Sequence, residues 1–400
     1  MTRRPTLAGW MLIAMVLGAA FGALAPPGAA QHLAIVPKIF LRLIQAVIAP
    51  VLLGVLISAG AGAGSAREFG RLALRAAIYF ELMTAAALLT GWGAVWLVQP
   101  GRAFHFANSG GAAAVPQIPS AADVVTNAVP SSLFDALARG DILQIVIFTA
   151  LFGAACAAAG VKAGPVTAFA GALTSVAFEF TRLIMCAAPL AVFASMAVTV
   201  AGNGSTALGG LAQFVITAWA AQSAFAIVAF GLSLRMAGIP LPAFTRAVRE
   251  PFLVGFATTS SAAALPQTLE SMSRLGISPR VVGIVTPLSL TLNLTGSCIH
   301  LAMGALFAAQ GAGMHLSAGQ QLAILATLKL TSKGVAGIPR ANLVILAGLF
   351  AMFGLPAETL PMLLGIDALI DPVRTSVNVL GHAVAAPVMA RFHNEPARAS

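Results

Sequence analysis

A run of polar side chains interrupts an apolar stretch near the C-terminus. It reads DALIDPVRTSVNVLGH, from Asp367 to His382, with LPMLLGI before it and AVAAPVMA after it. Burying an ionised group in hydrocarbon costs roughly 2.5–3.5 kcal/mol even on lenient insertion scales. On an α-helix six of these residues fall within a stripe about 100° wide, and a stripe of this kind must face protein or water. The six are Asp367, Asp371, Arg374, Thr375, Asn378 and His382.

The residue types on this stripe suit a small zwitterion that carries an extra acid. The guanidinium of Arg374 is a planar, two-pronged donor that matches a carboxylate. Asp371, three residues earlier, can accept from an ammonium, and hydroxyls or free backbone N–H groups elsewhere suit a second carboxylate. Two carboxylates and one ammonium describe aspartate or glutamate. The alternative is that Asp371 and Arg374 neutralise each other across one helical turn.

The composition gives the class of protein. Of 400 residues, 59% are hydrophobic and 8% are charged, whereas soluble domains carry about 25% charged residues. The chain is therefore expected to be a polytopic membrane protein. Its net charge of +10 comes from Lys and Arg spread over short loops, which is typical of cytoplasmic loops and not of a nucleic-acid surface. The three cysteines lie in apolar stretches and are interpreted as small hydrophobic residues.

Apolar spans predict helices that cross the roughly 30 Å hydrocarbon core. Arg3 and Arg4 precede the first span and predict a cytoplasmic N-terminus, so this span is interpreted as a membrane helix and not as a signal peptide. A polar loop is expected from Gly101 to Gly140. The predicted spans are about 8–25, 40–62, 71–98, 141–160, 165–200 and 208–237.

The pattern changes from about residue 243. Two polar patches, FATTSSAAALP (Phe256–Pro266) and LTSKGVAGIPRAN (Leu330–Asn342), lie between apolar stretches too short to cross a membrane alone. They predict two re-entrant helical hairpins, since non-helical backbone at that depth needs cover from protein. Each is followed by a helix with a polar interruption, first TLNLTGS (Thr291–Ser297) and then DPVRTSVNVLGH. Such paired units indicate a transporter with its site at the repeat interface, although Ser, Thr and Gly also serve ordinary helix packing.

These stretches resemble the dicarboxylate/amino acid:cation symporter family, the glutamate transporters. The matching motifs are TTSSAAALP, NLTGS where the family usually reads NMDGT, SKGVAGIP, and GIDALIDPVRTSVNVLGH. Weaker similarity extends upstream through FLRLIQAVIAPVLLG and NAVPSSLFDALARGDILQIVIF. The resemblance therefore covers most of the chain.

The resemblance implies an all-α elevator-type fold of eight transmembrane helices plus two re-entrant hairpins, with inverted repeats, as a homotrimer in the bacterial inner membrane. Scaffold helices 1–2 would occupy residues 1–70, and scaffold helices 4–5 residues 141–205. Helix 3 and the long loop would occupy 71–140, and helix 6 with the transport core 206–400. The core would hold hairpin 1 (about 243–276), helix 7 (279–309), hairpin 2 (318–353) and helix 8 (357–393).

The resemblance also implies roles for individual residues. Arg374 would hold the side-chain carboxylate of the substrate, Asp371 its ammonium, and the hairpin tips its α-carboxylate. In the C4-dicarboxylate branch the position of Asp371 is usually serine and that of Thr375 usually alanine, so an acidic amino acid is favoured over succinate. The expected substrate-binding residues are Thr259, Ser260, Ser261, Ser297, Gly337, Ile338, Asp371, Arg374, Thr375 and Asn378.

The departures from the family concern the co-transported cation. Thr295 and His382 stand where sodium-coupled members have aspartates, and Phe80 and Met83 stand where a third-helix Tyr and Thr help to enclose sodium. We therefore favour protons, carried by titratable groups such as His382, Glu81 or His300, over sodium; His382 is alternatively an ordinary helix-end histidine. No other cofactor is expected. The expected coupling residues are Asn293, Thr295, Asp367, His382 and Glu81, with a residual sodium site near Thr291, Ser332 and Val335.

Three other readings stay open at this point. Ser260 or Ser261 could be the nucleophile of a membrane hydrolase, but the only candidate base is Lys333. A passive channel would conduct without concentrating its solute. A sodium-coupled symporter of succinate, malate or fumarate would belong to the same family.

Overall fold

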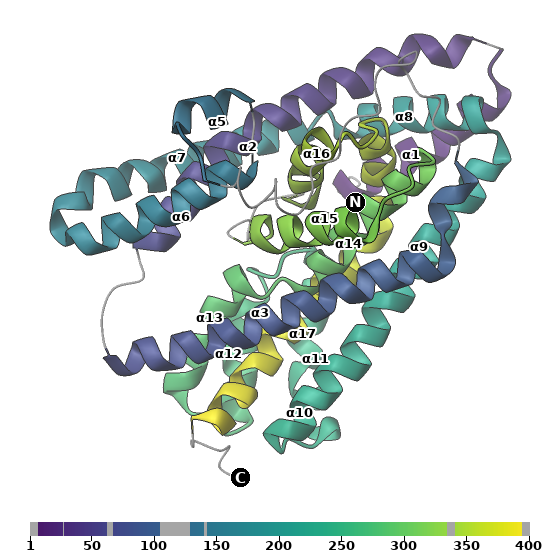
Figure 1. Cartoon of the computed structure of the whole chain (residues 1–400). Coiled ribbons are helices and arrows are strands. Elements are labelled where there is room, and N and C mark those ends of the chain that lie inside the picture. The colour runs from purple at the N-terminus through teal and green to yellow at the C-terminus, as the bar shows by residue number, and fades with distance from the viewer. Residues whose placement is uncertain are drawn as a thin grey trace, which may run out of the picture.

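The computed structural model describes residues 7–26, 28–61, 67–104, 129–139, 142–333 and 341–393. Throughout these ranges the regular structure is helical, without a strand, which confirms the predicted all-helical class. Most of the loop predicted between Gly101 and Gly140 lies outside the described residues, as do Arg3 and Arg4. Long helices run obliquely across one another (Figure 1).

One group of helices comes from the first half of the chain. The long helix α2 packs against α6 and α7, while α1 packs along α8. Figure 1 shows α5, α6 and α7 together beside α2. The bounds of this group are α1 (Leu7–Leu24), α2 (Ile35–Ala61), α5 (Leu133–Arg139), α6 (Ile142–Ala159), α7 (Gly164–Met185) and α8 (Ala188–Asn203), with short 3-10 turns at Ala29–Ala34 and Gly160–Ala163.

A second group joins α3 to the rest of the chain. Helix α3 packs along α14, and α17 contacts α8, α9, α11, α13 and α14. The bounds are α3 (Arg67–Val98), α9 (Ser205–Phe225), α10 (Gly231–Ala237), α11 (Leu241–Thr258), α12 (Leu265–Arg274), α13 (Pro279–Leu292), α14 (Thr295–Gly311), α15 (Ala318–Thr331), α16 (Ala341–Phe353) and α17 (Thr359–Phe392), with a 3-10 turn at Pro100–Ala103 and a π-helical turn at Ala226–Phe230.

The apolar run at about 165–200 is two helices and not one span. Helix α7 ends at Met185, a turn follows at Cys186 and Ala187, and α8 begins at Ala188. Pro189 explains the break, because it occupies the first turn of α8, where a missing backbone N–H is tolerated, and it restricts the backbone before it. Hydropathy alone does not detect this break, since the turn is apolar.

The polar patches coincide with breaks of two kinds. Residues 259–264 form a non-helical tip between α11 and α12, which pack against each other. At TLNLTGS, α13 ends at Leu292 and α14 begins at Thr295. By contrast, DPVRTSVNVLGH lies inside one continuous helix, α17. Its interruption is therefore one of polarity and not of backbone.

Four segments of the described chain are long and apolar enough to cross a membrane: Leu72–Val98, Ile147–Met185, Leu208–Ala237 and Pro279–Gly311. Shorter apolar helices lie at Gly9–Leu24, Ala188–Gly202 and Asn342–Phe353. Large apolar side chains are exposed on α1, α3, α7 and α9. These exposed faces suit contact with lipid or with another membrane-embedded surface.

Close packing of α3 on α14 depends on Gly91. A Cβ built at Gly91 would overlap the backbone oxygen of Ile299 and lie 3.1 Å from the Cβ of Ala302. Two residues further along α3, a Cβ built at Gly93 would meet nothing within 4 Å. Gly91 and Gly93 therefore offer a test position in the helix contact and a control position outside it, on the same helix.

We expect Gly91→Ala to destabilise the folded protein by about 1–3 kcal/mol, because the added methyl group must force two helices apart. Gly93→Ala should be neutral or slightly stabilising, since alanine favours a helix by about 1 kcal/mol over glycine. Thermal unfolding of the purified protein in detergent measures both. Equal midpoints for the two variants would contradict the observed α3–α14 contact.

Candidate functional site

The polar stripe of α17 is buried along its length. Asp367 is 1% exposed, Arg374 5% and His382 2%, and the other three members are also buried, Asp371 being the most exposed of the six at 9%. Helices α8, α9, α11, α13 and α14 surround α17. The stripe therefore faces other helices, as its charge demands in an apolar protein.

Arg374 is the centre of this stripe. Its Nη1 donates to Oδ1 of Asp367 at 2.5 Å and its Nη2 donates to Oδ1 of Asp371 at 2.6 Å. Thr375 donates from Oγ1 to the same oxygen of Asp371 at 3.1 Å. Helical spacing accounts for this geometry, because residues three and seven positions earlier lie on the same face. The ion pair between Asp371 and Arg374 that the sequence left open is present in the structure. Arg374 also forms a second ion pair, with Asp367.

His300 approaches the cluster from α14. Its Nε2 lies 4.0 Å from Oδ1 of Asp367, and its Nδ1 has no hydrogen-bond partner in the described part of the chain. The ring packs edge-on against Phe214 and is 1% exposed. Among the described residues, the cluster thus joins two carboxylates and one guanidinium, with the imidazole of His300 beside them.

The start of α14 is fastened to α17 one turn further along. Oδ1 of Asn378 accepts from the backbone N–H groups of Gly296 and Ser297 at 2.9 and 3.3 Å, and its Nδ2 donates to Oγ of Ser297 at 3.2 Å. These N–H groups belong to a helix start, where no intrahelical acceptor exists. A Cβ at Gly296 would overlap the backbone oxygen of Arg374. The helix break and the charged cluster are therefore in direct contact.

Thr295, Asn293 and His382 gather near the same break. Nδ2 of Asn293 donates to the backbone oxygen of Gly381 at 3.1 Å, and a Cβ built on Gly381 would lie 3.1 Å from Oγ1 of Thr295. All three side chains are buried. Oγ1 of Thr295, Oδ1 of Asn293 and both ring nitrogens of His382 have no hydrogen-bond partner among the described residues. The positions expected to hold cation ligands thus carry buried, uncharged oxygens at Thr295 and Asn293, and a buried imidazole at His382.

The two helices of the first hairpin, α11 and α12, pack on α17. Thr259 closes α11 in the left-handed conformation with φ 51°, and Oγ of Ser260 accepts from the backbone N–H of Ala263. Behind the tip, Oγ of Ser376 donates to the backbone oxygen of Phe252 at 3.3 Å. Thr259 is exposed, while Ser260 and Ser261 are partly buried. The structure thus brings the hairpin helices to α17, while the hydrogen bond found for a tip side chain stays within the tip.

The second hairpin contributes fewer described residues. Gly337, Ile338 and Val335 lie outside the described residues. The hydroxyls of Thr291 and Ser332 donate to backbone oxygens three residues earlier in their own segments. Glu81 on α3 forms ion pairs with Lys329 at 3.4 Å and Lys333 at 3.1 Å, with its side chain 46% exposed. It is bound to these lysines and not to the Arg374 cluster.

Lys333, which the sequence offered only as a candidate hydrolase base, makes partly buried polar contacts in the structure. Its Nζ donates to Oγ1 of Thr84 and to the backbone oxygen of Leu292, both at 2.9 Å. An ammonium in an apolar segment was the available signal, but its partners come from α3 and α13, far away in sequence. In the described ranges no group of three or more His, Cys, Asp or Glu side chains is arranged to hold a metal ion.

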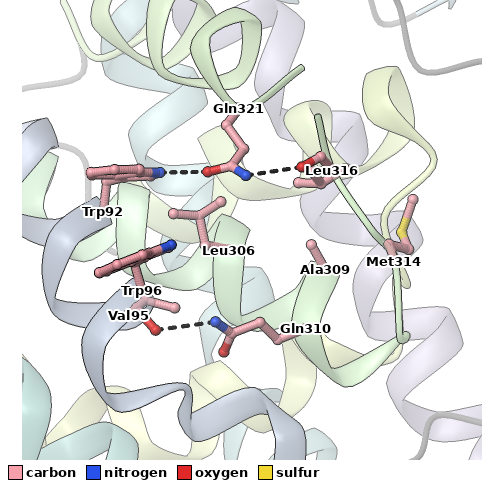
Figure 2. Close-up of a pocket in the computed structure, with 9 residues that line it drawn as sticks. All are labelled: Trp92, Val95, Trp96, Leu306, Ala309, Gln310, Met314, Leu316 and Gln321. Carbon is pink, nitrogen blue, oxygen red and sulfur yellow. Dashed lines mark hydrogen bonds between the residues drawn. The ribbon is translucent and has the colours of Figure 1, made fainter. Parts of the chain in front are cut away.

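A separate pocket lies between α3 and the helices α14 and α15 (Figure 2). Trp92 donates from Nε1 to Oε1 of Gln321 at 2.6 Å, and Gln321 donates to the backbone oxygen of Leu316 at 3.0 Å. Gln310 donates to the backbone oxygen of Val95 at 3.1 Å. None of its lining residues belongs to the α17 stripe. The side-chain amides of Gln310 and Gln321 therefore fasten α14 and α15 to α3.

Comparison with known proteins finds similarity to transport proteins along nearly the whole chain. Residues 7–392 match the sodium:dicarboxylate symporter family. The chain is 33% identical over 405 residues to a proton/sodium-glutamate symport protein of Bacillus subtilis, covering 98% of this chain and 94% of that protein. It is 35% identical over 397 residues to a C4-dicarboxylate transport protein of Anaeromyxobacter (96% and 89% covered) and over 403 residues to C4-dicarboxylate transport protein 3 of Ralstonia nicotianae (97% and 90%). These proteins are transporters, so the hydrolase reading is set aside.

Replacing Asn378 tests the junction of α14 with α17. We expect Asn378→Ala to cost about 1–3 kcal/mol of stability, because two buried N–H groups lose their acceptor. Asn342→Ala is the control, since Asn342 is also a buried asparagine (5% exposed) but its Nδ2 has no partner among the described residues. Thermal unfolding of both variants measures the difference. An Asn378→Ala protein as stable as the control would contradict a stabilising role of the hydrogen bonds between Asn378 and the start of α14.

Proposed function

The chain belongs to the sodium:dicarboxylate symporter family, and we propose that it imports an acidic amino acid, L-aspartate or L-glutamate, together with protons. Family membership makes it a symporter for small acidic solutes with a co-transported cation. Overall identity does not choose the substrate, because glutamate and C4-dicarboxylate relatives match it at 33% and 35%. The choice rests on individual side chains.

The arrangement that carries the proposal is the guanidinium of Arg374 held between Asp367 and Asp371. In the described part of the chain, two carboxylates share this one guanidinium. An amino-acid substrate brings an ammonium that can pair with one aspartate, and a carboxylate that can pair with the guanidinium. A dicarboxylate would add two negative charges and supply no donor for Asp371. Desolvated charge without a partner is heavily penalised, which favours the amino acid.

Binding then takes the form of an exchange of partners. Asp371 moves from the guanidinium to the substrate ammonium, and the substrate side-chain carboxylate takes the vacated Nη2 of Arg374. Asp367 keeps its contact and holds the guanidinium in place. Thr375, which already bonds to Asp371, steadies the carboxylate, and Asn378 with Ser297 borders the site. Thr259, Ser260, Ser261, Gly337 and Ile338 are proposed to receive the α-carboxylate from the hairpin tips.

The proposed coupling to protons follows from the groups around the helix break. Sodium is a hard cation and prefers oxygen ligands, anionic ones above all. Thr295 and His382 supply a hydroxyl and an imidazole where the family resemblance implies carboxylates. An acidic amino acid carries net negative charge across a low-dielectric barrier and needs compensating positive charge. Protonation of His382, or of Asp367 and His300 at the other end of the stripe, is proposed to supply it.

The proposed movement is an elevator in which one group of helices slides against another. Helices α1, α2 and α6–α8 pack among themselves, while α3 and α9–α17 pack around the site. This grouping supports a scaffold of residues 1–70 and 141–205 and a moving part of residues 71–140 and 206–400, with α5 as the exception because it packs on α6. Eight transmembrane helices, two re-entrant hairpins, a homotrimer and the bacterial inner membrane complete the proposal.

The rival within the family is sodium-coupled import of a C4-dicarboxylate, which the names of several relatives favour. Uptake of labelled L-aspartate and succinate into proteoliposomes separates the two, with proton and sodium gradients imposed one at a time. The proposal expects aspartate uptake in sodium-free buffer that an uncoupler stops. Uptake that requires sodium and ignores the proton gradient would disprove proton coupling, and preferential succinate uptake would disprove the amino-acid substrate.

Arg374→Ala should weaken acidic substrate binding by at least about 100-fold, because removing one partner of a buried ion pair costs about 3–5 kcal/mol. Serine or alanine should then bind weakly in its place. Arg391→Ala is the control, since Arg391 lies on the same helix but is exposed. Saturation binding to protein that elutes as a single species measures both. Near-normal aspartate affinity in Arg374→Ala would refute the assignment.

His382→Ala should impair coupling more than binding. We expect accumulation driven by a proton gradient to fall several-fold, because the variant loses a proton-accepting group beside the helix break. Exchange of internal for external aspartate, which needs no net proton movement, should be largely kept. His315→Ala, at an exposed position, should affect neither. Equal losses of accumulation and exchange in His382→Ala would assign this residue to structure and not to coupling.

A further inference from the structure

Lys333 makes contacts that the proposed binding site does not use. It lies two residues beyond the end of α15, and its side chain is only 16% exposed. Its Nζ is surrounded by three oxygens: Oγ1 of Thr84 at 2.9 Å, the backbone oxygen of Leu292 at 2.9 Å and Oε1 of Glu81 at 3.1 Å. An ammonium has three donors, and each of them has a partner here.

These oxygens form the kind of environment that binds a hard cation. Leu292 is the last residue of α13, where backbone carbonyls lack intrahelical partners and the helix end is partly negative. Thr84 is fully buried on α3, and Glu81 adds a carboxylate. A carbonyl, a hydroxyl and a carboxylate from two helices are typical oxygen ligands of hard metal ions.

We propose that the ammonium of Lys333 is the resident cation of this site, formed by Thr84, Leu292 and Glu81, and that it excludes a free monovalent cation. The side chain provides permanently the charge that a dissolved ion would otherwise provide. It also fastens the end of α15 to the broken end of α13. The inference rests on the proposed function in one respect, because it supplies a second reason for transport without sodium.

The neighbouring Lys329 shows what an ordinary ion pair looks like in the same place. Its Nζ lies 3.4 Å from Oε2 of Glu81, and both side chains are substantially exposed, at 39% and 46%. It shares Glu81 with Lys333, yet no bond from it to the end of α13 or to Thr84 is observed. Lys329→Met therefore removes a charge beside Glu81 without emptying the site, and it is a matched control.

The test uses thermal unfolding of the purified full chain without substrate, in sodium chloride and in choline chloride of equal ionic strength. Lys333→Ala removes the ammonium and leaves space, so sodium should raise its midpoint by several degrees more than that of the wild type, since a ligand that binds only the folded state stabilises it. Lys333→Met also removes the charge but fills the space, so its response should stay close to that of the wild type. Lys329→Met should behave as the wild type.

The comparison with the wild type cancels sodium binding at any other site. A sodium response of Lys333→Ala equal to that of the wild type or of Lys329→Met would overturn the proposal, and so would an equal response of Lys333→Met. Failure of Lys333→Ala to fold in both salts would also overturn it, because sodium should refill an emptied site. This test measures unfolding and not transport. Sodium-dependent uptake by the wild type would therefore refute the proposed proton coupling, but it would not decide the outcome of this test.

Discussion

The guanidinium of Arg374 is buried between the carboxylates of Asp367 and Asp371, and the helices around it serve to keep these charges away from lipid. Taking charges out of water is expensive, and Coulombic attraction repays the cost only when the geometry is good and the remaining hydrogen bonds are made. Both charged contacts of Arg374 are short, and Thr375 adds a bond to Asp371. Packing of α8, α9, α11, α13, α14 and further helices around α17 completes the isolation. A buried pair of this kind is a poor source of net stability, which is compatible with the proposed role in substrate binding.

The break between α13 and α14 depends on the same helix. Non-helical backbone within a membrane is tolerated only where protein or water satisfies it. Asn378 satisfies the N–H groups at the start of α14, Asn293 is bonded to Gly381, and Lys333 satisfies the last carbonyl of α13. The absence of a side chain at Gly296 lets α14 begin against the backbone of Arg374. The break therefore places polar backbone next to the charged cluster, where a charged solute and its coupling ion would need it.

Much of this arrangement follows from the sequence, because charge in an apolar chain is so costly. The spacing of Asp367, Asp371 and Arg374 predicts their common face, and TLNLTGS and TTSSAAALP predict the breaks after Leu292 and after Thr258. The turn at Cys186 and Ala187 was missed because it is apolar. The contacts of Lys333 were missed because Thr84 and Leu292 are brought to it only by the packing of α3 and α13. Whether Arg374 pairs with one aspartate or two depends on side-chain conformations that spacing does not determine.

The central claim is that Asp371 and Arg374 recognise an acidic amino acid together. Calorimetric titration of the purified protein in sodium-free buffer, with L-aspartate and with succinate, tests it most directly when wild type and Asp371→Ser are compared. We expect the wild type to bind aspartate at least about tenfold more tightly than succinate, a difference of about 1.4 kcal/mol. We also expect Asp371→Ser, which removes the partner of the ammonium, to reverse the order. Tighter binding of succinate than of aspartate by the wild type would contradict the account.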